Sequence, residues 1–109
     1  MTADLVAKTC QPCEGGVEPM PDSHIEPMLA EVSGWEQIDG HIERTFRFKS
    51  YCRTIAFVNA VAWMADREGH HPDLEVGFRE CKVKFHTHAI DGLSENDFIC
   101  AAKVNQIHG

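Results

Sequence analysis

Long apolar stretches are absent from this sequence of 109 residues, and none approaches the roughly 20 residues that a membrane-spanning helix needs. Positive charge is scarce, because 10 Lys and Arg stand against 17 Asp and Glu, for a net charge of −7. Such a balance argues against a protein that holds nucleic acid or an anionic membrane through its general field. The N-terminus lacks the basic start and the apolar core of a secretory signal. We therefore expect a cytoplasmic protein that binds neither nucleic acid nor membrane.

Cysteines are odd in number and scattered, unlike the dense, even spacing of disulfide-stapled secreted domains. We expect most of them to be reduced and buried. Cys10 and Cys13 form a CxxC motif, which suits half a zinc site, completed by His24 and Cys52, or a redox pair. Neither a second ligand pair nor a strand opening a helix is visible, so a local turn or an arm contact is the simpler interpretation.

The chain divides into two parts. Residues 1–22 contain three prolines and two glycines and few large apolar side chains, which predicts an irregular N-terminal arm. We expect residues 23–109 to form a single domain. Within it, apolar spacing predicts helices from Ser23 to Gly34, from Ser50 to Gly69 and from Ser94 onward. Alternating residues predict strands over 35–38, 41–48, 74–78 and 81–88.

Local signals support these elements. Ser23 with Glu26 forms a capping box, Asp39-Gly40 suits a two-residue hairpin turn, and Ser94 is followed by an acidic residue three positions later. The central helix carries an apolar stripe of Ile55, Val58, Ala62 and Ala65, flanked by Phe57, Val61 and Met64. On the last strand, Cys81, Val83, Phe85 and Thr87 face one way, and Lys82, Lys84, His86 and His88 face the other. The order α-β-β-α-β-β-α indicates an α+β fold, a four-stranded antiparallel sheet packed on one face by three helices.

Four histidines, His70, His71, His86 and His88, lie within 19 residues at the two ends of one predicted hairpin. Because the strands of a hairpin return to one neighbourhood, these rings can meet. Imidazole exchanges protons near neutral pH, so a pocket of this kind suits acid and base chemistry. Pro72 biases His71 toward an extended conformation, which would fix the direction of the pair.

Two other interpretations compete for the same residues. His70, His71, His88 and Asp97 would meet the ligand list of a zinc site, although adjacent histidines diverge and no HxxxH spacing supports one. The rings could also be ordinary surface histidines. Residue types and spacing leave these alternatives open.

A longer pattern resembles a known family. Asp66-Arg67-Glu68-Gly69-His70-His71-Pro72, then Phe78, then Thr87-His88, then Gly92 to Asp97 looks like the signature of the pterin-4a-carbinolamine dehydratases. Gly34-Trp35 and Phe46-Arg47-Phe48 extend the resemblance, and the CxxCxGG from Cys10 to Gly16 is similar to the N-terminal arm of many bacterial members.

The resemblance implies a fold of four antiparallel strands and three helices, and removal of water from the 4a-hydroxytetrahydropterin that aromatic amino acid hydroxylases release. It implies that His70 and His88 transfer protons and that His71 positions the pterin and assists. Substrate contacts would fall on His70, His71, Pro72, Thr87, His88, Ala89 and Ile90, with Asp66 and Asp97 supporting the histidines. It implies no metal and no cofactor, and a homodimer or homotetramer.

Two further roles follow from the same resemblance. Animal members also serve as dimerisation cofactors of a homeodomain transcription factor, which suggests a binding or regulatory module without catalysis. A role in molybdopterin metabolism has been proposed for some members. Leu74 departs from the Trp of the animal members, which removes an aromatic contact expected at that position but leaves the histidines in place.

Overall fold

A computed structural model describes residues 2–12 and 18–109 of the chain. Its elements, in chain order, are α1 (Thr2–Ala7), α2 (Asp22–Ala30), β1 (Glu36–Ile38), β2 (His41–Arg47), α3 (Tyr51–Glu68), β3 (Asp73–Val76), β4 (Glu80–Phe85), the 3₁₀ turn η1 (His88–Ile90) and α4 (Glu95–His108). The predicted order of helices and strands is confirmed, with α1 added before it. No helix in the described part of the chain is long and apolar enough to cross a membrane.

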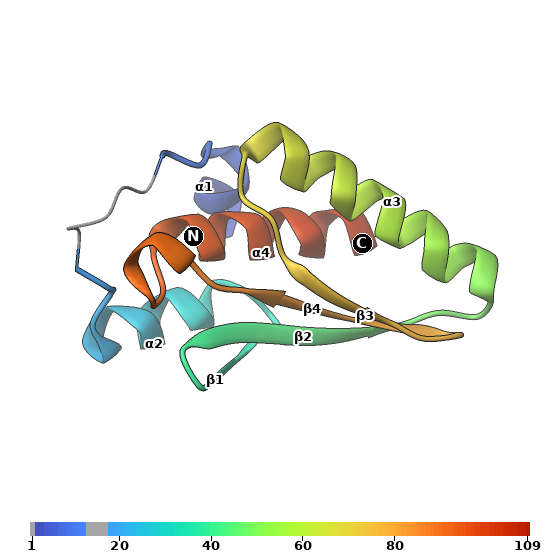
Figure 1. Cartoon of the computed structure of the whole chain (residues 1–109), viewed down its shortest axis with the longest axis horizontal. Helices are drawn as coiled ribbons and strands as arrows, with labels where there is room; N and C mark the ends of the chain where they lie inside the picture. Colours follow the sequence, from blue (N-terminus) through green and yellow to red (C-terminus); the bar gives the residue numbers. More distant parts are fainter. Residues whose placement is uncertain (1, 13–17) are drawn as a thin grey trace.

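The four strands form one antiparallel sheet in the order β1-β2-β4-β3, and α1, α3 and α4 lie on one side of it (Figure 1). The β1–β2 hairpin pairs Ile38 with His41, so Asp39 and Gly40 form the predicted two-residue turn. Both have positive φ angles, 47° and 82°, as this turn requires. The antiparallel sheet with its helices on one face is therefore confirmed.

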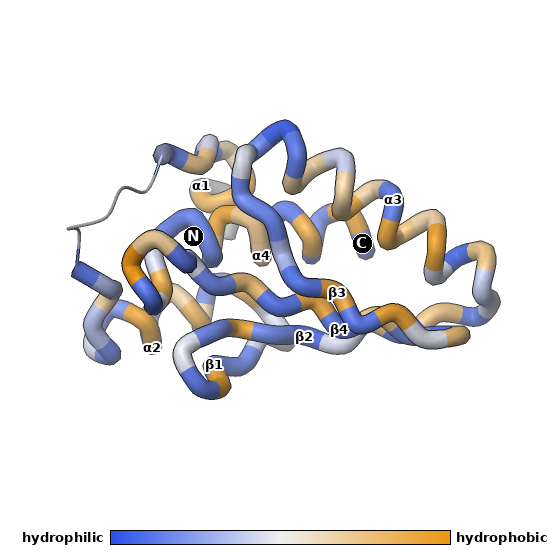
Figure 2. Tube along the Cα trace, in the orientation of Figure 1, coloured by the Kyte–Doolittle hydropathy of each residue, from blue (hydrophilic) through white to orange (hydrophobic). Residues whose placement is uncertain are grey.

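The core lies between this sheet and the helices. Hydropathy alternates along β4 (Figure 2), where Cys81, Val83 and Phe85 are fully buried. Phe85 pairs in register with Ile42 of β2 and lies 5.8 Å, ring to ring, from Trp35. Every second side chain of the strand therefore faces the core, as the alternation in sequence predicted.

Helix α3 has the predicted ends. The Ser50 hydroxyl accepts a hydrogen bond from the Arg53 N–H, and Gly69 closes the helix with a φ of 68°. Its buried face is shifted from the predicted stripe and consists of Thr54, Phe57, Val61 and Ala65. Burial of a threonine is possible because the Thr54 hydroxyl donates hydrogen bonds to backbone carbonyls of Ser50 and Phe78.

Two predictions near the N-terminus are wrong. The arm predicted as irregular contains α1, which forms because Leu5 is buried against α4 and the Lys103 ammonium donates to the Val6 carbonyl. Ser23 does not cap α2. The helix begins at Asp22 because the Pro21 carbonyl accepts the Ile25 N–H, which leaves Ser23 inside the first turn.

Helix α4 is the most buried helix, since residues from Asn96 to Ala102 and Val104 are all enclosed. It begins with a capping box between Ser94 and Asp97, as the sequence predicted. Near its other end, the Asn105 side-chain oxygen accepts from the Trp35 indole and from the Arg44 guanidinium, at 2.8 and 2.7 Å. Both ends of α4 are thus fixed, and its first turn lies under the predicted histidine pocket.

Candidate active site

His70 follows the C-terminus of α3 and lies against the sheet. Gly69 reverses the chain, and the His70 N–H donates to the Ala65 carbonyl at 3.2 Å. The His70 ring stacks on Phe85 with centroids 5.9 Å apart and an interplanar angle of 9°. Its side chain is only 12% exposed. Backbone and packing together therefore hold this ring in one orientation.

A buried carboxylate faces the ring. Nε2 of His70 lies 2.6 Å from Oδ1 of Asp97, whose side chain is 0% exposed. An ionised carboxylate only accepts hydrogen bonds, so Nε2 carries the proton and donates it to Asp97. Nδ1 is then the ring nitrogen free to exchange a proton. The pairing predicted for Asp97 is thus present as a short, charge-assisted hydrogen bond.

The second oxygen of Asp97 has two donors of its own. Oδ2 accepts from the Thr87 hydroxyl at 2.7 Å and from the Ser94 N–H at 3.0 Å. The Thr87 and Ser94 hydroxyls lie 2.8 Å apart, and because Thr87 gives its proton to Asp97, Ser94 must be the donor between them. The N-terminus of α4 adds a favourable dipole. Asp97 is therefore stabilised as a buried negative charge.

His88 lies on η1 and not on a strand. The predicted strand over 81–88 ends at Phe85, because Thr87 pairs with Gly92 in an isolated bridge that turns the chain into η1. His88 is consequently exposed, and its ring lies 4.7 Å from the His86 ring, edge to face. From this turn, His88 lines the same cavity as Glu68 and Gly69 at the end of α3.

One cavity of about 450 Å³ collects the histidines. It is lined by Cys10, Gln11, Pro12, Glu68, Gly69, His70, His71, His86, Thr87, His88, Ala89 and Asn96. His70, His71 and His88, the three predicted catalytic residues, share this space, together with two predicted substrate contacts, Thr87 and Ala89.

Four other predicted residues do not line the cavity. Asp97 lies beneath it and acts on His70. Ile90 is 9% exposed and belongs to the core, and Pro72 lies beside a neighbouring hollow. Asp66 is 86% exposed and contacts His71 Nε2 at 3.5 Å on the outer surface. The roles expected for these residues stay predictions.

Sequence reasoning missed the part of the cavity lining that comes from the N-terminal arm, namely Cys10, Gln11 and Pro12, which we call the arm wall. The Asn96 side chain accepts from the Gln11 N–H at 3.0 Å and donates to the Gln11 carbonyl at 2.6 Å. The Cys10 N–H donates to Glu68 Oε1 at 2.8 Å. Docking of this kind depends on tertiary contact between the arm and two helices, and no local pattern encodes it.

Glu68 holds this wall by its charge. Burial raises the pKa of Glu68, but the hydrogen bond from the Cys10 N–H and the ammonium of Lys103 at 3.5 Å outweigh burial and lower it. Glu68 is thus a carboxylate at neutral pH. Next to it, the contact with Cys10 and burial raise the pKa of the Cys100 thiol far above its ordinary value.

The metal interpretation finds no support in residues 2–12 and 18–109, where no three His, Cys, Asp or Glu side chains are placed to hold an ion. Nε2 of His70 is directed at Asp97. Cys52 is exposed on α3, and Cys10 contacts Cys100 instead. Cys13, the second residue of the CxxC motif, lies outside the described residues.

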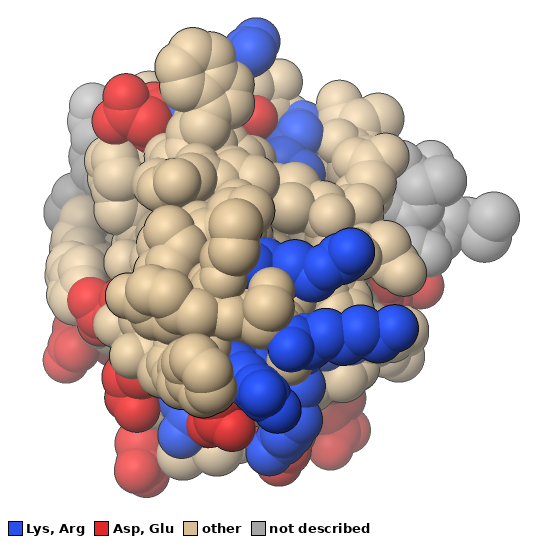
Figure 3. All heavy atoms as spheres, turned by 90° about the vertical axis from the view of Figure 1, so that its right-hand side faces the viewer, with Lys and Arg blue, Asp and Glu red and all other residues tan. Residues whose placement is uncertain are grey.

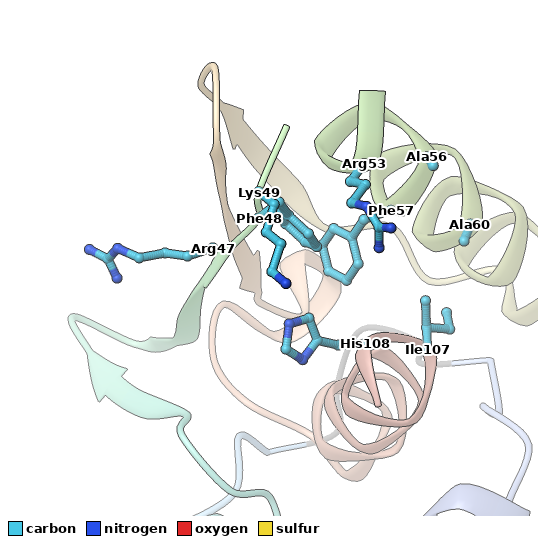
Figure 4. A pocket seen from close by; sticks show the side chains of 9 residues that line it. All are labelled: Arg47, Phe48, Lys49, Arg53, Ala56, Phe57, Ala60, Ile107 and His108. Carbon is cyan, nitrogen blue, oxygen red and sulfur yellow. The ribbon is translucent and has the colours of Figure 1, made fainter. Parts of the chain in front are cut away.

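A second hollow, also of about 450 Å³, lies between the opposite ends of α3 and α4. Lys and Arg side chains gather at this end of the molecule (Figure 3). In Figure 4, Lys49 points toward the His108 ring, Arg53 lies beside Phe57, and Arg47 points away. Its lining residues, all in the described part of the chain, include no carboxylate. The His108 ring therefore has no carboxylate beside it among these lining residues, whereas His70 has Asp97, so the histidine cavity is the better candidate for proton chemistry.

Comparison with known proteins adds a family relationship. Residues 18–107 match the family model described as pterin 4 alpha carbinolamine dehydratase. A protein from Nitrosomonas eutropha is 54% identical over 95% of this chain and 93% of its own length. One from Legionella pneumophila is 47% identical over 98% and 97%. Both are provisionally named pterin-4-alpha-carbinolamine dehydratase.

Solved structures share the fold. The crystal structure of a transcriptional coactivator/pterin dehydratase from Brucella melitensis superposes with a TM-score of 0.81 at 29% identity, over 84% of this chain and all of that one. A pterin dehydratase-like protein identified as a RuBisCO assembly factor in the alpha-carboxysome has a TM-score of 0.58 at 24% identity, over 69% and 87%. The second likeness concerns the fold alone.

Proposed function

The chain belongs to the pterin-4a-carbinolamine dehydratase family, and we propose that it removes water from a 4a-hydroxytetrahydropterin by histidine acid and base catalysis. Such a reaction makes the enzyme a hydro-lyase. The observation that carries the proposal is the His70 ring, which Asp97 holds at 2.6 Å from beneath, in a cavity that also holds His71 and His88.

The chemistry needs two proton transfers. The bond between C4a and the hydroxyl oxygen breaks, that oxygen takes up a proton and leaves as water, and a ring nitrogen loses a proton to give the quinonoid dihydropterin. One group must therefore act as acid and another as base. No electrons enter or leave, so the step requires no redox cofactor.

His70 and His88 are the groups we assign to these transfers. Asp97 holds the proton of His70 on Nε2 and stabilises the ring when it becomes charged, which leaves Nδ1 to exchange a proton with the substrate. His88 faces the same cavity from η1 and is exposed, so it can exchange its proton with water between turnovers. His71 lines the same cavity and would position the pterin.

Stopped-flow measurement of 4a-hydroxytetrahydropterin loss tests this assignment. We expect His70→Ala and His88→Ala each to lower kcat by about 10²-fold or more, which is the usual contribution of a positioned acid or base. His24→Ala, at an exposed position on α2, should keep full activity. If the wild-type chain leaves the spontaneous rate unchanged, the binding-module interpretation becomes the better one.

The substrate's origin follows from its chemistry. We propose that the enzyme acts after an aromatic amino acid hydroxylase, in the cytoplasm, where scattered unpaired cysteines are typical. Adding the protein to a working hydroxylase should speed the return of reduced pterin. A source organism with no such hydroxylase would favour the molybdopterin role instead.

We also propose that the chain forms a homodimer or homotetramer. Edge strand β3 presents unpaired backbone groups, which favour strand addition by a second copy. Light scattering should give at least twice the 12.2 kDa of one chain. A measured mass of one chain would exclude the oligomer.

A further inference from the structure

Two thiols from distant parts of the chain meet beside the histidine cavity. Sγ of Cys10, which follows α1, lies 3.5 Å from Sγ of Cys100 in α4. Cys100 is completely buried, whereas Cys10 is partly exposed and lines the cavity. The proposed dehydration does not use this contact.

Polar contacts on both sides of Cys10 hold its sulfur in place. Its N–H donates to Glu68 at 2.8 Å, its thiol donates to the Asn96 carbonyl at 3.7 Å, and the next residue, Gln11, forms the reciprocal pair with Asn96. Because the Cys10 proton is directed at Asn96, the Cys100 thiol is the donor between the two sulfurs. The contact is therefore part of an ordered network and not a chance approach of two side chains.

We propose that Cys10 and Cys100 are a thiol modification site that a low-molecular-weight disulfide oxidises to an intramolecular disulfide, fastening the arm to α4 at the wall of the histidine cavity.

The chemistry proceeds by two thiol–disulfide exchanges. The accessible Cys10 thiolate attacks one sulfur of glutathione disulfide, which forms a mixed disulfide and releases one glutathione thiolate. Cys100 then attacks the Cys10 sulfur, the bond to glutathione breaks, and the Cys100 proton passes to the departing thiolate. Two protein thiols are oxidised, and one glutathione disulfide is reduced to two glutathione molecules.

The short distance between the two sulfurs favours the second exchange, whereas protonation of the Cys100 thiol slows it. A disulfide bond is about 2.05 Å long, so the sulfurs need to approach by about 1.5 Å, which the short arm can supply without moving α4. The contact with Cys10 and burial raise the pKa of Cys100, so only a small fraction of Cys100 side chains are thiolates at any moment. We expect the mixed disulfide to form first and the intramolecular bond to follow over minutes to hours.

The experiment uses the full chain carrying Cys13→Ser and Cys52→Ser, which leaves Cys10, Cys81 and Cys100. Glutathione disulfide is added, free thiols are blocked with N-ethylmaleimide, and tryptic peptides are analysed by mass spectrometry. We expect a cross-linked pair joining residues 9–44 to residues 85–103. The bond closes a long loop, so Tm should rise by roughly 10 °C and return on addition of dithiothreitol.

The matched control adds Cys100→Ala to the same background. It should stop at the mixed disulfide on Cys10 and show no comparable rise in Tm. The five-cysteine chain is treated in parallel. The proposal is overturned if the Cys100-containing background also stops at the mixed disulfide, or if the five-cysteine chain joins Cys10 only to Cys13. None of these readouts depends on dehydratase activity.

Discussion

Nε2 of His70 and Oδ1 of Asp97 are 2.6 Å apart, and the carboxylate has no exposure to solvent. Three donors converge on Asp97, and two of them, the His70 ring and the Thr87 hydroxyl, belong to residues that line the cavity. The carboxylate therefore decides which nitrogen of His70 carries the proton. This makes Asp97 a positioning residue for the proposed chemistry, although it lies outside the cavity itself.

Asp97→Asn tests that relationship. The Oδ2 position accepts two donors and the Oδ1 position only one, so the amide nitrogen should take the side facing His70. His70 would then accept a hydrogen bond at Nε2 and carry its proton on Nδ1. Nδ1, the nitrogen that exchanges a proton with the substrate, could then no longer accept one. We expect kcat to fall by about 10²-fold with KM little changed, and the free energy of unfolding to fall by about 1–3 kcal/mol. Stopped-flow assays and urea unfolding measure both.

Asp91→Asn is the matched control. Asp91 is 99% exposed, lies 3.6 Å from Nε2 of His86, and has a φ of 49° that Asn tolerates. Its kcat should stay within about twofold of wild type, and its stability within about 0.5 kcal/mol. Equal losses in the two variants would show that the buried pair has no special role.

Gly69 directs His70 into the cavity, which gives a second prediction. Its φ of 68° is costly for a residue with a Cβ, although nothing lies within 4 Å of that position. Gly69→Ala should therefore lower the free energy of unfolding by about 1 kcal/mol through backbone strain alone, and Gly69→Asn by less. Gly77→Ala, where φ is ordinary and the added Cβ meets only normal contacts, should be neutral in the same urea experiment. A Gly69→Ala variant as stable as wild type would contradict this account.

Much of the fold could be predicted from sequence because its signals are local. Ser50 and Gly69 mark the ends of α3, Asp39-Gly40 marks a hairpin, and alternation marks the buried face of β4. The buried face of α3 could not be predicted in the same way. Thr54 is buried because its hydroxyl is accepted by the Ser50 carbonyl, four residues away, and by the Phe78 carbonyl, 24 residues away, and hydropathy alone cannot show this.

The candidate site also has a part that could be predicted from sequence and a part that depends on tertiary packing. The histidines were found from the sequence because a hairpin brings its two ends together, and the family resemblance pointed to the same rings. The arm's contribution was missed, since Gln11 and Asn96 are 85 residues apart and carry no shared motif. Only tertiary packing of the arm against α4 brings them together.

Asn96→Ala gives a third prediction, on the wall formed by the arm. The substitution removes the acceptor for the Gln11 N–H and the donor for its carbonyl, and water can replace only part of what is lost. We expect the free energy of unfolding to fall by about 1–2 kcal/mol and KM to rise severalfold with a smaller change in kcat. Asn59→Ala, on the exposed side of α3, should change neither value. A rise in KM for both variants would show that the change in KM does not come from the loss of the Asn96–Gln11 contact.

The last prediction concerns pH and Glu68. Because its pKa is lowered in the folded protein, Glu68 holds a proton less readily there than in the unfolded chain. The contribution of the Glu68 charge to the free energy of unfolding is therefore fully present above about pH 4.5 and is lost as the pH falls through the lowered folded pKa. Glu68→Gln should be less stable than wild type at pH 7, by about 1–2 kcal/mol, because an amide accepts the Cys10 N–H more weakly and loses the attraction of Lys103. The two unfolding free energies should converge as the pH is lowered toward 3. Glu26→Gln, at an exposed position on α2, should follow the wild-type curve throughout. A gap between wild type and Glu68→Gln that persists unchanged at pH 3 would mean that shape, and not the charge of Glu68, holds the arm.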